Sequence, residues 1–139
     1  MTKTRIIELV EESEWMRPMV VQEKKTQGEI RICIDLRKLN DACLHDPFPT
    51  PFTDEVLGNL GGHEAYSFTD GFAGYHKIRI APEDQHKSTF AIEWGSYQHI
   101  VMPFGLKNAL DIFSRVVVAN FNEYIHKFLG VYFDGWTIF

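Results

Sequence analysis

Two aspartates, Asp70 and Asp134, each follow a strand-like run and stand beside a glycine. Because glycine tolerates backbone conformations that other residues avoid, each carboxylate can be turned toward a cleft. Carboxylate oxygens are the ligands that Mg²⁺ prefers, so the two residues are candidate ligands of a divalent cation. Two separated aspartates are also common at ordinary turns, and the sequence leaves that structural alternative open.

A second candidate site lies in a short basic segment. Residues 24–40 carry five basic and two acidic residues (5 − 2 = +3), whereas residues 1–23 carry 3 − 5 = −2 and residues 41–139 carry 6 − 12 = −6. Lys24, Lys25 and Arg31, together with Arg37 and Lys38, could therefore bind phosphates, the arginines as bidentate forks and the lysines as point charges. An ordinary solvated hairpin face is the alternative. The net charge of −5 argues against binding nucleic acid through the whole surface.

Other site classes have little support in the sequence. It contains neither a G-x-x-x-x-G-K-[ST] nor a G-x-G-x-x-G motif, and its six histidines show no metal-ligand spacing. The two cysteines are too few for a disulfide framework, and Cys33 is expected to be a buried small hydrophobe. Because no run resembles a membrane span or a signal peptide, an intracellular location without membrane contact is expected.

The pattern of apolar residues predicts one α+β domain that positions these side chains. Alternation predicts strands over 19–23, 29–36, 65–70, 76–80, 88–94 and 97–102, with turns at 24–28 and at Gly95-Ser96. Apolar residues at spacings of three and four predict a helix over 108–126, a shorter helix should run from 53 or 54 to 60, and 82–84 form a helical turn or loop. Residues 128–139 should form a hairpin with Asp134-Gly135 as its turn.

Several ordered motifs resemble one family, the reverse transcriptases of long-terminal-repeat retrotransposons, most closely the plant Ty3/gypsy-like type. The resemblance runs from about Met19 to Phe139 and leaves residues 1–18 as an acidic lead-in. It rests on Arg31-x-Cys33-x-Asp35-x-Arg37-x-Leu39-Asn40, Pro47-x-Pro49-x-Pro51, Phe68-Thr69-Asp70-Gly71-Phe72-Ala73-Gly74-Tyr75-His76, Met102-Pro103-Phe104-Gly105-Leu106-Lys107-Asn108-Ala109 and Tyr132-Phe133-Asp134.

The resemblance implies the fingers and palm of a right-handed polymerase fold, an antiparallel sheet packed on helices. Residues up to about 65 and again near 83–102 would contribute fingers, and the rest palm. The chain stops just after the last hairpin, so a thumb is expected to be absent. A thumb, a ribonuclease H domain and an integrase are expected elsewhere in the full Pol polyprotein.

The resemblance also implies an activity, RNA-directed DNA synthesis by nucleotidyl transfer. In the family, Asp70 and the adjacent carboxylates of a Tyr-x-Asp-Asp hairpin, here Asp134, hold two Mg²⁺ ions, with Mn²⁺ as a substitute. The implied partners are an RNA or DNA template-primer and deoxynucleoside triphosphates. The implied nucleotide contacts are Lys24 or Lys25, Arg31, the sugar-selecting Tyr75, Phe104 and Gly105.

The chain departs from the family pattern at three positions. Gly135 replaces the second hairpin aspartate, Leu110 replaces a proline, and Gly130 stands where relatives have a charged or larger residue. Losing one metal-ligand carboxylate predicts impaired catalysis. Two alternatives therefore stay open: a noncatalytic remnant that binds nucleic acid or a protein, and a retroelement relic without a selected role.

Overall fold

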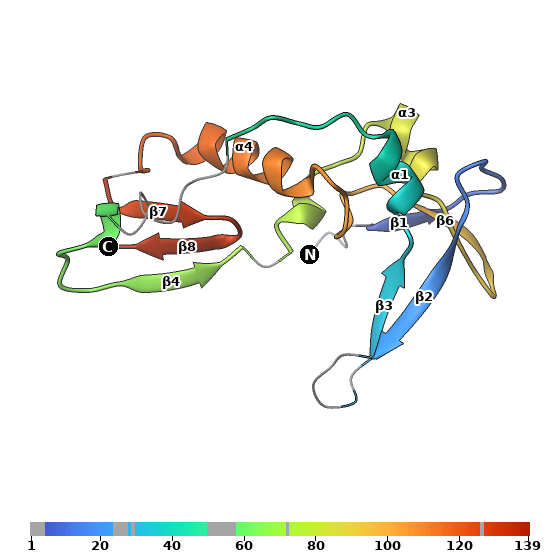
Figure 1. Ribbon diagram of the computed structural model, residues 1–139, viewed down its shortest axis with the longest axis horizontal. Helices are drawn as coiled ribbons and strands as arrows, with labels where there is room; N and C mark the ends of the chain where they lie inside the picture. Colours follow the sequence, from blue (N-terminus) through green and yellow to red (C-terminus); the bar gives the residue numbers. More distant parts are fainter. Residues whose placement is uncertain (1–4, 24–27, 29, 50–57, 72, 126) are drawn as a thin grey trace. The chain divides into compact units, whose positions relative to one another are not determined.

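The computed structural model describes residues 5–23, 28, 30–49, 58–71, 73–125 and 127–139 (Figure 1). The chain forms two compact units. The first comprises Met1–Leu44 and His76–Lys107, and the second comprises His45–Tyr75 and Asn108–Phe139. The resemblance placed residues 45–65 with the fingers, but they cluster with the second unit, which also contains the closing hairpin.

The first unit is built on a five-stranded sheet. Its spatial order is β1-β6-β5-β2-β3, and all neighbours are antiparallel except β2 and β5. The strands are β1 (Ile7–Leu9), β2 (Arg17–Glu23), β3 (Ile30–Ile34), β5 (Phe90–Ile92) and β6 (Gly95–His99). Strand β1 comes from the segment expected to be a lead-in, and it pairs Ile7 with His99.

The predicted hairpin of β2 and β3 is confirmed, with Met19 opposite Ile34 and Glu23 opposite Ile30. Cys33 is half-buried rather than buried, and Ile30 and Ile32 are 65% and 66% exposed. Strand β3 lies at the edge of the sheet, and Figure 1 shows the hairpin extending away from the other strands of its unit. Because β3 is an edge strand among the strands that the structure describes, Cys33 has a neighbouring strand on one side alone, and its expected burial is wrong.

The helices of the first unit are short. They are α1 (Arg37–Ala42), α3 (Pro82–Gln85) and two 3₁₀ turns, η1 (Tyr75–Lys77) at its boundary and η2 (His86–Ser88). The helical turn expected at 82–84 is confirmed as α3. The core contains Leu36, Phe90, Val101 and Met102, beside the buried polar residues Ser88, Thr89 and His99.

One strand prediction and one turn prediction in this unit are also wrong. The strand predicted over 76–80 begins as η1, and its pairing is limited to the isolated bridge between Arg79 and Val101. The segment is extended, but it meets too little of its partner to form a strand. Gly95 and Ser96, expected as a turn, are the first residues of β6, because the chain reverses just before them and Ile92 pairs with Gly95.

In the second unit, α4 packs with a three-stranded antiparallel sheet in the order β4-β8-β7. Its elements are β4 (Ser67–Asp70), α4 (Ala109–Phe121), β7 (Leu129–Tyr132) and β8 (Gly135–Ile138). Ala109, Phe113 and Val117 recur at four-residue spacing and are buried, so the amphipathic helix is confirmed. It ends at Phe121 rather than near residue 126. A turn over residues 122–124 follows and leads to the isolated bridge between Ile125 and Leu129.

The helix predicted up to residue 60 lies largely outside the described residues. Residues 58–60 are helical and are followed by a turn at Gly61-Gly62, as expected. Among the helices that the structure describes, none has the length and apolar character needed to cross a membrane.

The closing hairpin is present, but its turn lies one residue earlier than predicted. Tyr132 pairs with Gly135, so Phe133 and Asp134 form the two-residue turn and Gly135 begins β8. Phe133 has φ 54°, as the first position of a type II′ turn requires, whereas Gly135 is not in the left-handed region. The prediction of an Asp-Gly turn was wrong because the position that needs positive φ is occupied by phenylalanine.

Candidate active site

The pairing of β4 with β8 brings the two predicted aspartates to neighbouring backbone positions. Asp70 lies opposite Gly135, the residue that follows Asp134. The Gly71 N–H donates a hydrogen bond to the Asp134 carbonyl oxygen at 2.6 Å. Both aspartates are exposed at this end of the sheet. Residues more than sixty positions apart in the sequence therefore form one acidic edge.

Gly71 is required for this close approach. A β-carbon at Gly71 would lie 2.9 Å from the Asp134 carbonyl oxygen and 3.3 Å from Cζ of Phe113. A backbone oxygen cannot move aside as a flexible side chain can. The glycine after Asp70 therefore permits the contact between β4 and the hairpin, in addition to bending the chain.

Tyr75 lies in the same unit, at the start of η1, and its side chain is half-buried. Its ring packs against Phe113 with a centroid distance of 5.1 Å and an interplanar angle of 37°. Burial raises the pKa of the Tyr75 phenol above its usual value of 10.0, and the charge of Asp134 adds to the increase. The phenol therefore stays neutral near pH 7 and keeps its hydroxyl proton.

The acidic edge supplies two candidate carboxylate ligands for a divalent cation. Mg²⁺ is commonly held by one or two carboxylates and keeps several waters, which Asp70 and Asp134 can satisfy. Within the described part of the chain, no three His, Cys, Asp or Glu residues gather into a metal-binding group. Gly135 lies opposite Asp70, and directly opposed side chains share a face of the sheet. The carboxylate that the family has at this position is therefore missing beside Asp70.

The predicted nucleotide contacts other than Tyr75 belong to the first unit. Lys24 and Lys25 lie outside the described residues, and Arg31 pairs with Gln22 across the β2–β3 hairpin. Phe104 is 61% exposed, and its ring meets His76 edge-on with a centroid distance of 5.3 Å. Gly105 has φ +95°, which a residue with a side chain rarely adopts.

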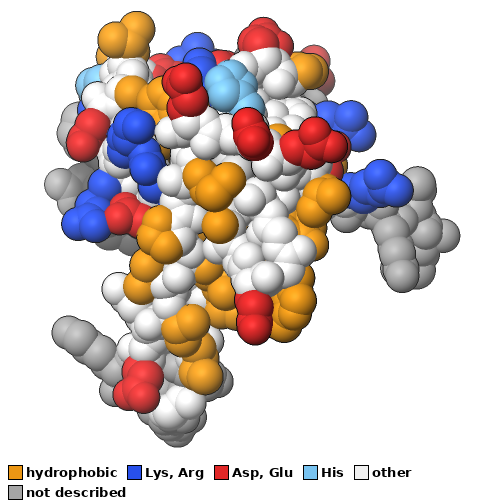
Figure 2. Space-filling view, turned by 90° about the vertical axis from the view of Figure 1, so that its right-hand side faces the viewer, with side chains coloured by type: hydrophobic (Ala, Val, Ile, Leu, Met, Phe, Trp, Pro, Cys, Tyr) orange, Lys and Arg blue, Asp and Glu red, His pale blue; other side chains and the backbone are white. Residues whose placement is uncertain are grey.

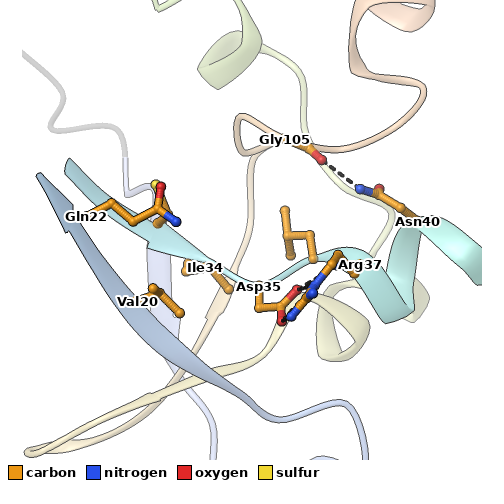
Figure 3. A pocket seen from close by; sticks show the side chains of 9 residues that line it. Val20, Gln22, Ile34, Asp35, Arg37, Asn40 and Gly105 are labelled. Carbon is orange, nitrogen blue, oxygen red and sulfur yellow. Dashed lines mark hydrogen bonds and ion pairs between the residues drawn. The ribbon is translucent and has the colours of Figure 1, made fainter. Parts of the chain in front are cut away.

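A cavity of about 480 Å³ opens in the first unit (Figure 3). It is lined by Val20, Gln22, Cys33, Ile34, Asp35, Leu36, Arg37, Asn40 and Gly105. The polar side chains of this lining are those of Gln22, Asp35, Arg37 and Asn40, which offer both hydrogen-bond donors and acceptors. It could hold a polar ligand.

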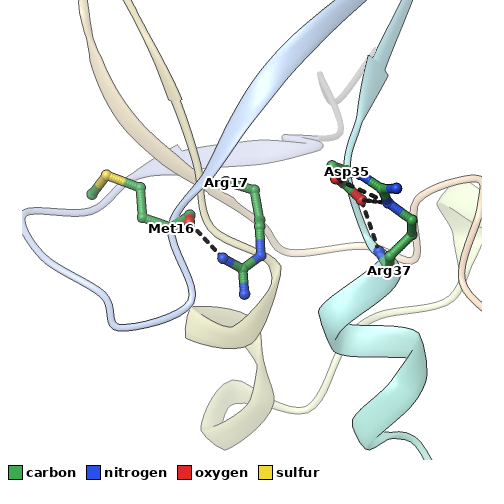
Figure 4. A network of polar contacts seen from close by, with 4 residues as sticks. All are labelled: Met16, Arg17, Asp35 and Arg37. Atoms are coloured by element: carbon green, nitrogen blue, oxygen red, sulfur yellow. Dashed lines mark hydrogen bonds and ion pairs between the residues drawn. The ribbon is translucent and has the colours of Figure 1, made fainter.

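Asp35 and Arg37 form a fork at this cavity (Figure 4). Arg37 donates from Nε and Nη2 to the Asp35 carboxylate at distances of 2.6–3.1 Å, and its backbone N–H also donates at 3.1 Å. The side-chain hydrogen bonds, followed by the backbone one, lower the pKa of Asp35 to about 2, and the charge of Arg17 lowers it further. Asp35 thus stays ionised and orients the Arg37 guanidinium.

Asn40 belongs to a motif of the first unit, and its sequence position predicts no role for it. In the structure its side chain holds the loop that contains the predicted contact Gly105. Nδ2 of Asn40 donates to the Gly105 carbonyl oxygen at 2.8 Å, and Oδ1 accepts from the Lys107 N–H at 2.8 Å. The only sequence signal was an asparagine at the end of a motif, because its partners lie 65 and 67 residues away.

On the face in Figure 2, acidic and basic side chains are interspersed with apolar ones.

Comparison with known proteins gives the family directly. The sequence profile of the family described as "Reverse transcriptase (RNA-dependent DNA polymerase)" matches residues 22–139. The chain is 38% identical over 109 residues to the "Retrovirus-related Pol polyprotein from transposon gypsy" of Drosophila melanogaster, covering 78% of this chain and 10% of that polyprotein. It is 34% identical over 110 residues to the "RNA-directed DNA polymerase homolog" of Oenothera berteroana, covering 79% and 78%.

Solved structures share the fold. The protease-reverse transcriptase of prototype foamy virus matches 96% of this chain and 17% of its own, with a TM-score of 0.80 and 20% identity. The foamy viral protein in complex with an RNA/DNA hybrid matches 96% of this chain and 18% of its own, with a TM-score of 0.82 and 19% identity. The predicted α+β polymerase fold is therefore confirmed.

The chain spans about a tenth of the length of the gypsy polyprotein that it matches. The family profile covers most of the chain, and the plant homolog is matched over most of its own length. The chain belongs to the reverse transcriptase (RNA-dependent DNA polymerase) family and is a reverse transcriptase domain of the gypsy-like Pol type.

Proposed function

We propose that this chain carries the metal-binding carboxylates and the nucleotide-contacting residues of an RNA-directed DNA polymerase. The observation that carries the proposal is the register of β4 and β8. It pairs Asp70 with Gly135 and joins Gly71 to Asp134 by a backbone hydrogen bond, so that two distant carboxylates meet at one edge. Family membership supplies the reaction class, transfer of a nucleotide to a primer 3′ hydroxyl.

In this proposal Asp70 and Asp134 hold one divalent cation, Mg²⁺ or Mn²⁺. When bound, the ion lowers the pKa of the primer hydroxyl and neutralises charge on the phosphates. The two residues would fix its position, because Asp70 ends β4 and Asp134 lies in the turn just before β8, the strand that pairs with β4. The half-buried Tyr75 ring limits the room for a 2′ hydroxyl and so favours deoxynucleotides.

The proposed partners are a template-primer and deoxynucleoside triphosphates. Lys24, Lys25 and Arg31 would contact the triphosphate, and Phe104-Gly105 would line the nucleotide pocket. A foamy viral relative of the same fold is described in complex with an RNA/DNA hybrid, which supports a hybrid as the first ligand to test. Phosphate contacts predict that affinity for the hybrid falls with salt and weakens in Lys25→Ala or Arg31→Ala. Salt-independent binding would instead favour a protein partner.

Gly135 is proposed to lower the activity of this chain. It leaves the acidic edge with one carboxylate fewer than the family pattern has, and a misplacement of reacting groups by 1 Å can cost about 10²-fold in rate. A side chain is sterically allowed there, because a β-carbon at Gly135 would meet only the Tyr132 carbonyl oxygen, at 3.4 Å. Gly135→Asp should therefore fold and strengthen the metal site.

Metal affinity tests the site directly. Binding of Mn²⁺ to the purified chain, followed by electron paramagnetic resonance, should be lost in Asp70→Asn and in Asp134→Asn. It should become tighter in Gly135→Asp. Glu64→Gln is the matched control, because Glu64 is also exposed but precedes the other end of β4. Binding that survives both aspartate substitutions would refute the metal assignment.

Primer extension tests the reaction. The assay uses a poly-rA template with an oligo-dT primer and Mg²⁺ or Mn²⁺. Gly135→Asp should extend the primer faster than the unmodified chain does, and Asp134→Ala should abolish extension in either background. Activity that survives Asp134→Ala would refute the assigned role of Asp134. No gain in Gly135→Asp, with tighter Mn²⁺ binding already measured, would refute the proposed cause of impairment.

A further inference from the structure

An aromatic residue outside the predicted site, Phe113, lies beside the turn that follows Asp70. Phe113 lies in α4, is 5% exposed and packs within the second unit. Its ring meets the segment between Asp70 and Tyr75 at several points. By its sequence pattern alone, Phe113 is one apolar position of a helix.

Two glycines make room for the Phe113 ring. A β-carbon at Gly74 would lie 2.5 Å from Cε2 and 2.8 Å from Cζ of Phe113, and one at Gly71 would lie 3.3 Å from Cζ. The Gly74 N–H also donates to the Gly71 carbonyl oxygen at 2.7 Å, which closes a tight turn. Neither glycine has positive φ. Their lack of a side chain is therefore required for space, and the ring fills that space.

The same ring supports Tyr75. The centroids of Phe113 and Tyr75 are 5.1 Å apart with an interplanar angle of 37°, and aromatic pairs at this distance attract each other beyond simple burial. The Phe113 ring therefore occupies the space beside both glycines of the turn and packs on the tyrosine that follows it. Gly71 is in turn bonded to the Asp134 carbonyl oxygen.

We infer that Phe113 is the positioning residue of the candidate active site: seated between Gly71 and Gly74, it fixes the Tyr75 ring and thereby the selection of the nucleotide sugar. The inference rests on the proposed function, because Tyr75 is assigned there as the sugar-selecting residue. A rigid ring suits this role, since a shorter or flexible side chain would leave a gap into which the tyrosine could move.

A matched control is available on the same helix. Phe121 is also a helical phenylalanine with an aromatic partner, Trp136, at a centroid distance of 5.3 Å. It lies eight positions, about two helical turns, from Phe113. Phe121→Leu should cost packing in the same unit while leaving Tyr75 in place.

The first experiment records ¹H–¹³C spectra of the chain labelled with ¹³C-tyrosine, with Tyr75 assigned from the signal lost in Tyr75→Phe. The Tyr75 ring signals should shift in Phe113→Leu and stay in place in Phe121→Leu. If Phe113→Leu does not fold, Phe113→Met replaces it, because the thioether keeps much of the volume but is flexible. Unmoved Tyr75 signals in the Phe113 variant, or equal shifts in both variants, would overturn the inference.

The second experiment measures sugar selection in the Gly135→Asp background. The ratio of kcat/KM for a deoxynucleotide to that for the matching ribonucleotide should fall by at least about tenfold in Phe113→Leu, because the ring that excludes the 2′ hydroxyl is misplaced. Phe121→Leu should leave the ratio unchanged. An unchanged ratio in Phe113→Leu, with displaced Tyr75 signals, would overturn the link to sugar selection. Absence of any activity in Gly135→Asp would count against the proposed function, and the Tyr75 spectra would then decide the positioning role alone.

Discussion

The two glycines that follow the candidate aspartates Asp70 and Asp134 should respond very differently to the same substitution. Gly71→Ala places a β-carbon 2.9 Å from the Asp134 carbonyl oxygen and 3.3 Å from Phe113, whereas Gly135→Ala meets only the Tyr132 carbonyl oxygen at 3.4 Å. We therefore expect the first change to disturb the junction of β4 and the hairpin. The second should be accommodated.

The size of the effect follows from two contributions. Overpacking a close contact costs about 1–3 kcal/mol. Strain that breaks the 2.6 Å hydrogen bond from Gly71 to Asp134 removes roughly 1 kcal/mol more. Gly71→Ala should therefore lower the free energy of unfolding by about 2–4 kcal/mol. Gly135→Ala should change it by less than about 1 kcal/mol, and an increase is allowed because alanine restricts the unfolded chain.

Urea denaturation followed by tryptophan fluorescence measures both values. Trp136 lies in β8 and packs on Phe121, so it reports on the second unit when Trp15 and Trp94 are replaced by phenylalanine. Equal destabilisation by the two alanines would refute the steric argument. A neutral Gly71→Ala would do so as well, because the backbone contact would then not constrain position 71.

Three further predictions concern other contacts. His99 is 7% exposed, and burial lowers its pKa below 6.5, so the unfolded chain binds the proton more readily than the folded chain. The free energy of unfolding should therefore fall as the pH drops from 7 to 5. Denaturation curves should show a weaker pH dependence in His99→Phe. Asn40→Ala removes two hydrogen bonds to the loop at Gly105 and should cost about 1–3 kcal/mol in urea denaturation, with faster hydrogen exchange at the Lys107 amide. Arg115→Ala breaks the ion pair with Asp46, in which the arginine side chain is 57% exposed. Thermal unfolding should therefore show that the free energy of unfolding falls by no more than about 1 kcal/mol. A larger decrease would mean that the ion pair stabilises the unit more than its exposure indicates.

Local pattern predicted much of the fold. The hairpin of β2 and β3, the strand ending at Asp70, and α4 were all expected, because alternation and three-to-four spacing reflect which side of an element is apolar. The same patterns failed where a segment lacked a partner. The run at 76–80 alternates like a strand, but the structure gives it one isolated bridge to Val101.

The candidate site was predictable in its chemistry but not in its geometry. Asp70, Asp134 and Tyr75 stood out by residue type and motif, and all three lie in the second unit. Asn40 and Phe113 were not recognised, since their importance comes from partners distant in the sequence.

The sequence by itself determined most kinds of elements and the candidate acidic residues Asp70 and Asp134, because these depend on local periodicity and residue identity. Its resemblance to the family marked Gly135 as the position of a missing carboxylate. Only the tertiary structure decided that the hairpin turns at Phe133-Asp134, that Asp70 lies opposite Gly135, and that Phe113 fills the space left by Gly71 and Gly74. The physical reason is that register and close packing are set by atoms brought together from distant positions. No local pattern specifies which backbone oxygen will lie 2.9 Å from a missing β-carbon.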